Sequence, residues 1–449
     1  MFRTGLFAAS VFLGMAHCLP AQQPDAPNVI RVDVRQVLVP VVVTDGKGHH
    51  VTGLKASDFH VLEDGVPQEI SAFSTDTSPS VNALLAPRGE AGAAAPAPTA
   101  SKDAPIRTYV ICVDALNSAF ASSARTRDAL QHLFEKEKPG DARFVLLSIG
   151  RQLQVLQTAT TDTAAILAKL RSPAIPPALG GGDAATLRSE LNDLKSRMFD
   201  FCRSCDCNSP VACGVQAQDL KSSVDGEAEH WGAVRAQFLD QLKSVVEELA
   251  KLPGSRTLIL VSDGFSVQPS REFYAVIAPF LPKDQRFRMA GPMDLEPRVE
   301  AIIKVATERN VRIDSVHSSG LAQSSLSGSG SMDASAPSDR SAPSVISRRV
   351  PTSSRGGTLL SEMDREASSV ELQNGSALAE LAQSTGGVYH HDSNDLLKQF
   401  RSALADAREY YLLAYVSKNA APDGKFRKIS VEVADQKLHV RAKSGYWPE

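Results

Sequence analysis

Two carboxylates in this sequence stand where they could bind a hard cation. Asp114 follows the apolar run 108–113, and Asp263 follows the apolar run 256–261, and both runs are predicted to be buried strands. Ligands of open α/β sheets bind beyond the carboxyl ends of the strands. Divalent ions such as Mg²⁺ prefer oxygen ligands in such places. The indicated chemistry is cation binding or, in the simpler interpretation, capping of the turns and helices that follow.

Further polar side chains flank both carboxylates. Asn117 and Ser118 follow Asp114 in the segment DALNS, and Gly264 follows Asp263 in the segment SDGF. We expect the two carboxylates, with the hydroxyl and amide groups beside them, to be able to hold such a cation. Asn117 and Gly264 are predicted to belong to the ligand-binding loops around them.

Strands and helices alternate along the part of the chain that positions these loops. Predicted strands occupy 108–113, 144–149, 151–157, 256–261, 311–316 and 387–390. Predicted helices occupy 122–135, 229–252, 297–309, 376–384 and 394–407. This alternation is typical of a doubly wound, mostly parallel α/β sheet of the Rossmann-like kind.

The two ends of the chain have a different, β-rich pattern. The module 28–76 and the segment 408–449 each supply a few short strands, which are marginal alone. We expect them to pack together as an accessory, sandwich-like all-β domain. The α/β domain, 106–407, is then inserted between them, after an Ala- and Pro-rich linker at 79–105.

The first residues indicate export. Residues 1–21 combine an early arginine, an apolar stretch of about a dozen residues and a small-residue cleavage point after Ala21, which is typical of a signal peptide. A lipoprotein signal that uses Cys18 is the alternative. No later stretch is long and apolar enough to span a membrane. We expect a mature protein outside the cytoplasm, periplasmic or extracellular, with no transmembrane segment.

Two insertions interrupt the α/β pattern. Residues 318–370 are rich in Ser, Gly, Pro and Arg, and we expect them to be disordered. Residues 172–228 contain four closely spaced cysteines: Cys202, Cys205, Cys207 and Cys213. In a cytosolic chain such a group would suggest zinc, whereas in an exported chain two disulfides are expected, with three connectivities open.

Composition excludes some functions. The 48 basic and 51 acidic side chains give a net charge of −3, without the basic field of a nucleic-acid-binding protein. The sequence has no G-x-S-x-G elbow and no phosphate-binding loop of the P-loop type. The histidine pairs at 49–50 and 390–391 are interpreted as exposed loop residues. We therefore do not expect an enzyme.

Several blocks of the sequence resemble a known family. The strand followed by D-x-x-x-S, the segment GSRTLILVSDGF and the segment LAQSTGGVYH resemble the von Willebrand factor A (VWA) fold. The front segment VLVPVVVTDGKGHHVTGL and the rear segment EYYLLAYV resemble the secreted VWFA-related family of Acidobacteria-type bacteria. The resemblance covers about 30–449, apart from the two insertions.

The resemblance implies a metal-ion-dependent adhesion site, with Mg²⁺ or Mn²⁺ as the ion. Its ligands would be Asp114, Ser118, Asp263 and, from another loop, Thr186. This sequence departs from the D-x-S-x-S pattern at Leu116, which cannot bind a metal, so the site is degenerate. Asn117 is one position away and could substitute through its amide oxygen.

Together these observations predict an exported binding, adhesion-type or scaffold protein. Its ligand, a protein or a cell-envelope component, would dock at the loops on the carboxyl edge of the sheet. A metal-assisted hydrolase that uses the same carboxylates is one alternative. A structural envelope protein with a dead metal site is the other.

Overall fold

A computed structural model describes most of the chain. The described residues are 36–75, 107–136, 142–175, 179–204, 214–277, 294–320, 374–419, 421 and 423–448. The chain divides into two units, 1–35 and 36–449, and every described residue belongs to the second. The predicted signal peptide, the predicted linker and residues 321–370 of the second insertion lie outside the described residues.

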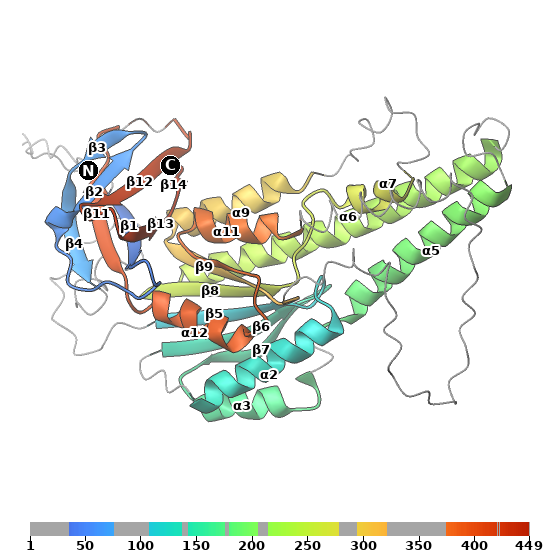
Figure 1. Ribbon diagram of the computed structural model, residues 1–449, viewed down its shortest axis with the longest axis horizontal. Coiled ribbons are helices and arrows are strands. Elements are labelled where there is room, and N and C mark those ends of the chain that lie inside the picture. The colour runs from blue at the N-terminus through green and yellow to red at the C-terminus, as the bar shows by residue number, and fades with distance from the viewer. Residues whose placement is uncertain are drawn as a thin grey trace, which may run out of the picture. The chain divides into compact units, whose positions relative to one another are not determined.

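A six-stranded sheet forms the centre of the α/β part (Figure 1). Its strands are β5 (Arg107–Asp114), β6 (Ala142–Ile149), β7 (Leu153–Thr160), β8 (Ser255–Ser262), β9 (Val311–His317) and β10 (Tyr389–His390). They lie in the order β10-β9-β8-β5-β6-β7. All neighbours are parallel except β6 and β7. The prediction of an α/β class with a mostly parallel sheet is confirmed.

Helices cover both faces of this sheet. Their bounds are α2 (Phe120–Lys136), α3 (Thr163–Arg171), α5 (Gly182–Ser204), α6 (Gly214–Ala250), α7 (Ser270–Ile277), α9 (Glu296–Glu308), α11 (Ser376–Ser384) and α12 (Leu396–Asp406). α2, α3 and α12 pack on one face, and α6, α9 and α11 pack on the other (Figure 1). Within the described ranges, no helix is both long and apolar enough to cross a membrane.

Strand β5 shows why its sequence reads as an uninterrupted apolar run. All eight of its residues are buried. Tyr109 and Ile111 enter the core beneath α2 and α12, whereas Val110 and Cys112 enter the core beneath α6 and α9. Successive side chains of a strand point to opposite faces, so a strand covered on both sides needs apolar residues at every position. Burial also raises the pKa of the Cys112 thiol, as an inert core cysteine requires.

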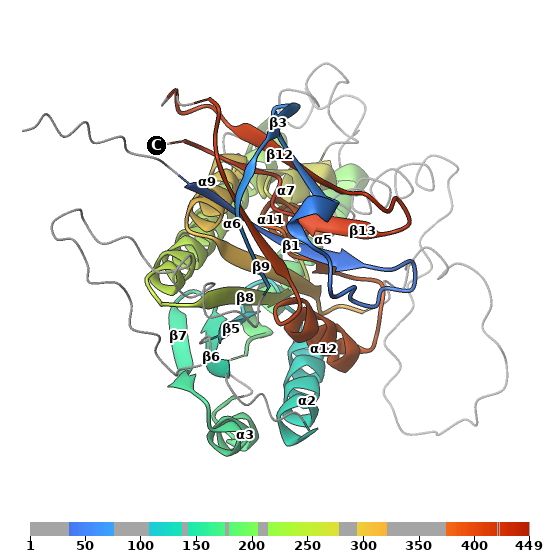
Figure 2. The same cartoon turned by 90° about the vertical axis from the view of Figure 1, so that its left-hand side faces the viewer.

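The two ends of the chain form two four-stranded antiparallel sheets. Their strands are β1 (Gln36–Thr44), β2 (Phe59–Glu63), β3 (Val66–Gln68), β4 (Ile70–Thr75), β11 (Tyr411–Val416), β12 (Arg427–Val433), β13 (His439–Ala442) and β14 (Gly445–Tyr446). One sheet has the order β13-β1-β11-β4 and the other β14-β12-β2-β3. Each sheet therefore mixes strands from both ends of the chain, and Figure 2 shows blue β1 beside red β13.

The first insertion differs from its prediction. We interpreted 172–228 as an insertion that interrupts the α/β pattern, but α5 and the first part of α6 occupy most of it with regular helix. Leu194 and Met198 of α5 are buried with Leu220 and Val224 of α6. These apolar residues recur at helical spacing, a signal that the cysteine pattern obscured. The side chain of Cys202, and all of Cys205, Cys207 and Cys213, lie outside the described residues.

Candidate functional site

Asp114 ends β5 and is completely buried. Its Oδ1 accepts hydrogen bonds from the backbone N–H groups of Leu116 (3.1 Å) and Asn117 (2.9 Å) and from Asn117 Nδ2 (3.1 Å). Its Oδ2 accepts from Asn117 Nδ2 (2.9 Å) and from the hydroxyl of Ser262 (2.6 Å). The carboxylate therefore organises the turn that follows its own strand and ties it to the end of β8.

Asp263 lies one residue beyond β8 and joins the same edge of the sheet. Its Oδ2 accepts from the N–H of Ala119 at 2.9 Å, and its own N–H donates to the Ser118 hydroxyl at 3.2 Å. Its Oδ1 accepts from the Ser318 hydroxyl at 2.7 Å. Ser318 is buried and begins the segment that we expected to be disordered, so that boundary is wrong by at least three residues. The chain turns there against Asp263 and is held by it.

Glycines allow the loops of this edge to approach one another. Gly264 has φ +90°, and a Cβ at this position would lie 2.6 Å from the carbonyl oxygen of Asn374. Gly180 has φ +99°, and a Cβ there would lie 2.2 Å from the carbonyl oxygen of Ala115. Both positions need the left-handed backbone and the missing side chain that only glycine combines. Gly264 thus belongs to the edge, as expected of a binding-loop residue.

Thr186 is placed differently from the other candidates. It lies in the second turn of α5, not in a loop, and it is exposed. Its hydroxyl donates to the carbonyl of Gly182 in the same helix at 3.0 Å. Among the described residues that hydrogen-bond to Asp114 or Asp263, Thr186 does not occur. The structure thus brings together Asp114, Asn117, Ser118 and Asp263, but not Thr186.

Burial dominates the electrostatics of Asp114. It raises the pKa of this carboxyl from 3.8 to about 6, although the hydrogen bonds from Ser262 and Asn117 favour the charged form. The nearby charge of Asp263 raises the pKa further. Hydrogen bonds from neutral groups thus only partly offset the loss of water around a buried charge.

The oxygens of Asp114 and Asn117 do not suit a divalent ion in the arrangement described. A carboxylate offers about four lone-pair sites, and Asp114 already accepts five hydrogen bonds. Leu116 is buried in the core beneath α6, so no hydroxyl stands at that position. Asn117 presents its Nδ2, a donor, to the carboxylate. The amide oxygen of Asn117 thus points away from Asp114 in this geometry, and the expected substitution through it stays a prediction.

Arg235 of α6 explains where that oxygen points. Its Nε donates to Asn117 Oδ1 at 3.4 Å, and its Nη2 donates to Glu272 of α7 at 3.0 Å. Both charged side chains are almost fully buried, at 4% and 8% exposure. Nothing in the spacing of the sequence singles out Arg235, because it lies on a helix far along the chain from Asn117.

One serine–histidine contact lies beside Asp263 and bears on hydrolase chemistry. Ser319 Oγ is 3.2 Å from His317 Nε2 and 3.5 Å from its Nδ1. His317 Nε2 also lies 3.0 Å from the carbonyl oxygen of Asp263, which can only accept, so this nitrogen carries the proton. The nitrogen left as a base, Nδ1, is too far from the hydroxyl for a good hydrogen bond. The pair is not arranged to activate a nucleophile.

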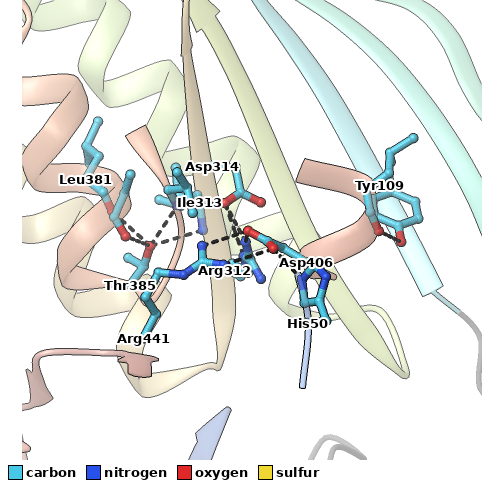
Figure 3. A network of polar contacts seen from close by, with 12 residues as sticks. His50, Tyr109, Arg312, Ile313, Asp314, Leu381, Thr385, Asp406 and Arg441 are labelled. Carbon is cyan, nitrogen blue, oxygen red and sulfur yellow. Dashed lines mark hydrogen bonds and ion pairs between the residues drawn. The ribbon is translucent and has the colours of Figure 1, made fainter. Parts of the chain in front are cut away.

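A second polar cluster lies where α12 and β9 meet the antiparallel sheets (Figure 3). Asp406, at the end of α12, accepts two hydrogen bonds from Arg441, at 2.7 and 2.9 Å. It also accepts from Arg312 of β9 at 3.1 Å and pairs with His50 at 2.6 Å. Burial alone would raise the pKa of Asp406, but the hydrogen bonds of Arg441 and the charges of both arginines outweigh it and lower the pKa.

Only one histidine of each pair is as exposed as we expected. His49 and His391 are exposed, with 76% and 48% of their side chains accessible. His50 has only 14% of its side chain accessible because it packs against Asp406. Burial lowers the pKa of His390. In each pair one exposed-loop assignment fails, that of His50 and that of His390, because these segments fold against the neighbouring sheet, which no local pattern reveals.

Comparisons with known proteins add little. No protein-family model matches the chain, and no curated protein matches it. Among solved structures, it is similar to an aerotolerance-related membrane protein from Bacteroides fragilis, with 12% identity and a TM-score of 0.28. It is also similar to the conserved hypothetical protein BatB from Bacteroides thetaiotaomicron, with 10% identity and a TM-score of 0.27. Each likeness covers 67% of this chain and 98% of the other. Scores this low carry no conclusion about this chain.

Proposed function

We propose that this chain is an exported binding or scaffold protein with a VWA-like α/β domain, and that it recognises a protein or cell-envelope ligand at the carboxyl edge of its central sheet. One observation carries the proposal. The loops after β5 and β8 meet at this edge and are joined by the hydrogen bonds of Asp114 and Asp263. The result is a preorganised surface rather than a pair of groups poised for proton transfer.

The strand order supports this location. From β5 the chain proceeds outward through β6 and β7 on one side, and through β8, β9 and β10 on the other. The order therefore reverses between β5 and β8, which is the switch point where open α/β sheets bind their ligands. A doubly wound order with one antiparallel edge strand also supports the finer, VWA-like assignment. The predicted signal peptide supports export.

Phe120 supplies an anchor for such a ligand. It begins α2 directly after Ser118 and Ala119, and it is 65% exposed. Ala119 is hydrogen-bonded to Asp263, so the backbone beside the ring is fixed. An exposed aromatic ring on a rigid backbone, beside polar groups, is typical of the residues that dominate binding energy in interfaces. The partner chemistry that fits is an apolar pocket with a polar rim.

Site-specific cross-linking tests the proposal. A photoreactive phenylalanine analogue at Phe120 should give a discrete adduct when the chain is made in its own cells. The matched control is the same analogue at Phe426, which is 40% exposed on the antiparallel sheets. We expect the adduct at Phe120 alone, and its loss in the presence of excess unlabelled chain. No adduct at Phe120, or the same adduct at both positions, would reject the binding surface and leave a purely structural protein.

The hydrolase alternative is weaker on this geometry. Of the described serine–histidine contacts at the edge, the one between Ser319 and His317 has its basic nitrogen 3.5 Å from the hydroxyl. The oxygens of Asp114 that would hold a catalytic metal are already saturated by donors. The same occupied oxygens of Asp114 also fit the other alternative, a structural envelope protein with a dead metal site. The cross-linking experiment separates it from a binding protein.

A further inference from the structure

The side chain of Asn117 lies between a buried acid and a buried base. Its Nδ2 donates to both oxygens of Asp114, at 3.1 and 2.9 Å, and its Oδ1 accepts from Arg235 Nε at 3.4 Å. The backbone N–H of Asn117 donates to Asp114 as well. One short side chain thus bridges β5 and α6 across the loop where the degenerate metal motif stands.

The two neighbours leave the amide of Asn117 only one orientation. A guanidinium has donors and no acceptor, and an ionised carboxylate has acceptors and no donor. If the amide turned over, its oxygen would face the carboxylate of Asp114 and its NH₂ would face the guanidinium of Arg235. Both contacts would then be repulsive. The orientation that places the NH₂ group on Asp114 is therefore imposed by Asp114 and Arg235 together.

Arg235 is itself held in place. Glu272 of α7 accepts from its Nη2 at 3.0 Å, and both side chains are at least nine-tenths buried. A buried guanidinium that lost these partners would retain a large desolvation cost. The guanidinium therefore does not leave Asn117 readily, and the three residues behave as one unit from α7 to β5.

From these contacts we infer that Arg235 is a positioning residue that keeps the Asn117 amide over Asp114 as a built-in plug, which excludes a divalent cation from the degenerate motif. The NH₂ group occupies both carboxylate oxygens, which a cation would need. The two N–H groups of the amide present partial positive charge to the carboxylate of Asp114. They can therefore order the loop without a metal. This inference does not depend on whether a partner docks at Phe120.

The plug has a consequence for the missing hydroxyl at Leu116. The substitution Leu116→Ser would restore the D-x-S-x-S pattern, but the Asn117 amide would still cover Asp114. We therefore expect that restoring the motif alone produces no binding of Mn²⁺, and that removing the plug as well does. Two double variants remove it in different ways: Leu116→Ser/Asn117→Ala deletes the amide, and Leu116→Ser/Arg235→Met releases it to turn over.

Titration of the mature chain with Mn²⁺ alone, followed by calorimetry and thermal unfolding, tests these variants. We expect no saturable binding for the wild type or for Leu116→Ser. At least one double variant should bind Mn²⁺ saturably, at least about tenfold more tightly than Leu116→Ser, which corresponds to about 1.4 kcal/mol. The matched control is Leu116→Ser/Arg298→Met, which removes a half-exposed arginine that pairs with Asp240. Binding by the wild type, or by the control as tightly as by the double variants, would overturn the plug, as would two folded double variants that bind nothing.

A measurement on the wild type covers the case in which the double variants do not fold. In an asparagine-labelled NMR sample, the side-chain NH₂ signals of Asn117 are assigned by their loss in Asn117→Ala. The plug predicts that stoichiometric Mn²⁺, which broadens nearby signals, leaves them unchanged. It also predicts that they exchange slowly with solvent and that exchange speeds up in Arg235→Met. Selective broadening by Mn²⁺, or exchange that does not respond to Arg235→Met, would refute it.

Discussion

Two of the buried aspartates of the α/β domain, Asp114 and Asp406, lie in different places, and their partners differ. Asp114, at the carboxyl edge of the sheet, accepts five hydrogen bonds, all from neutral groups. Asp406, beside the antiparallel sheets, accepts from two arginines and pairs with a histidine. Burial raises the pKa of Asp114 to about 6, whereas the arginines overcome burial and lower the pKa of Asp406.

The difference shows that the number of hydrogen bonds does not decide the state of a buried carboxylate. Asp114 accepts five hydrogen bonds and Asp406 four, yet none of the described donors to Asp114 is a cation. Here the hydrogen bonds and charges of two arginines outweigh the desolvation of Asp406, whereas the neutral donors around Asp114 offset its desolvation only in part. Asp406 is therefore suited to hold parts of the fold together, and Asp114 to shape a loop whose charge state responds to its surroundings.

The largest expected effect comes from Asp406. Replacing it with alanine leaves the guanidinium groups of Arg312 and Arg441 without their shared acceptor, so we expect a loss of about 3–5 kcal/mol in the free energy of unfolding. Urea denaturation measures this loss. The control is Asp128→Ala, which removes the 59%-exposed partner of Arg127 and should cost less than about 1 kcal/mol. Equal losses in the two variants would mean that the network around Asp406 is not stabilising.

Asp114 should make the free energy of unfolding depend on pH. Its folded-state pKa of about 6 lies above the ordinary 3.8, so the folded chain binds this proton more tightly than the unfolded chain. Its contribution to stability is therefore present below pH ~4 and is lost as the pH rises through 6, by up to about 3 kcal/mol. Relative to the wild type, Asp114→Asn should thus become more stable between pH 4 and pH 7. A flat difference across this range would contradict the raised pKa.

For Asp406 the same experiment should give the reverse sign. A lowered folded-state pKa stabilises the fold above the pKa of the unfolded chain and loses this contribution as the pH falls. The difference between the wild type and Asp406→Asn should therefore grow as the pH rises from 3 to 6. Curves of the same sign for both aspartates would remove the distinction between them.

The smallest expected effect separates two adjacent histidines. His50→Ala removes a 2.6 Å contact to Asp406, and we expect it to cost about 1–2 kcal/mol of unfolding free energy. His49→Ala changes a side chain that is 76% exposed, and it should stay within about 0.5 kcal/mol of the wild type. Thermal unfolding of the two variants makes the comparison. Similar midpoints would show that His50 adds nothing to the network.

Most of the fold was predictable because its signals are local. The apolar run 108–113 could only be a strand covered on both faces, and β5 has every residue buried. The helix predicted at 376–384 has the same bounds as α11. The length of α6 was missed, because its first half carries small and charged residues between the buried positions. The antiparallel direction of β7 could not be predicted either, because a periodic apolar pattern does not indicate the direction of a strand.

The candidate site was predictable only in part. The rule that parallel strands end at one edge predicted that Asp114 and Asp263 lie together, and the structure places them so. The orientation of the Asn117 amide depends on Arg235, which reaches it only through the packing of α6. The same limit applies to His50 and Asp406, which are distant in sequence and meet through the tertiary fold. Such contacts leave no spacing pattern to read.

The pairing of β1 with β11 and β13 has a consequence for how the chain folds. Gln36 pairs with Val416, and Thr44 pairs with His439. The strands that pair with β1 therefore lie near the other end of the sequence. Contacts that close such long loops form late and slowly. The α/β domain can fold first and bring the two ends together. A chain cut short before β11 would leave the buried valines of β1 on an open strand edge, prone to pair with other chains. Closure of these sheets is therefore a last step that only full-length chains complete.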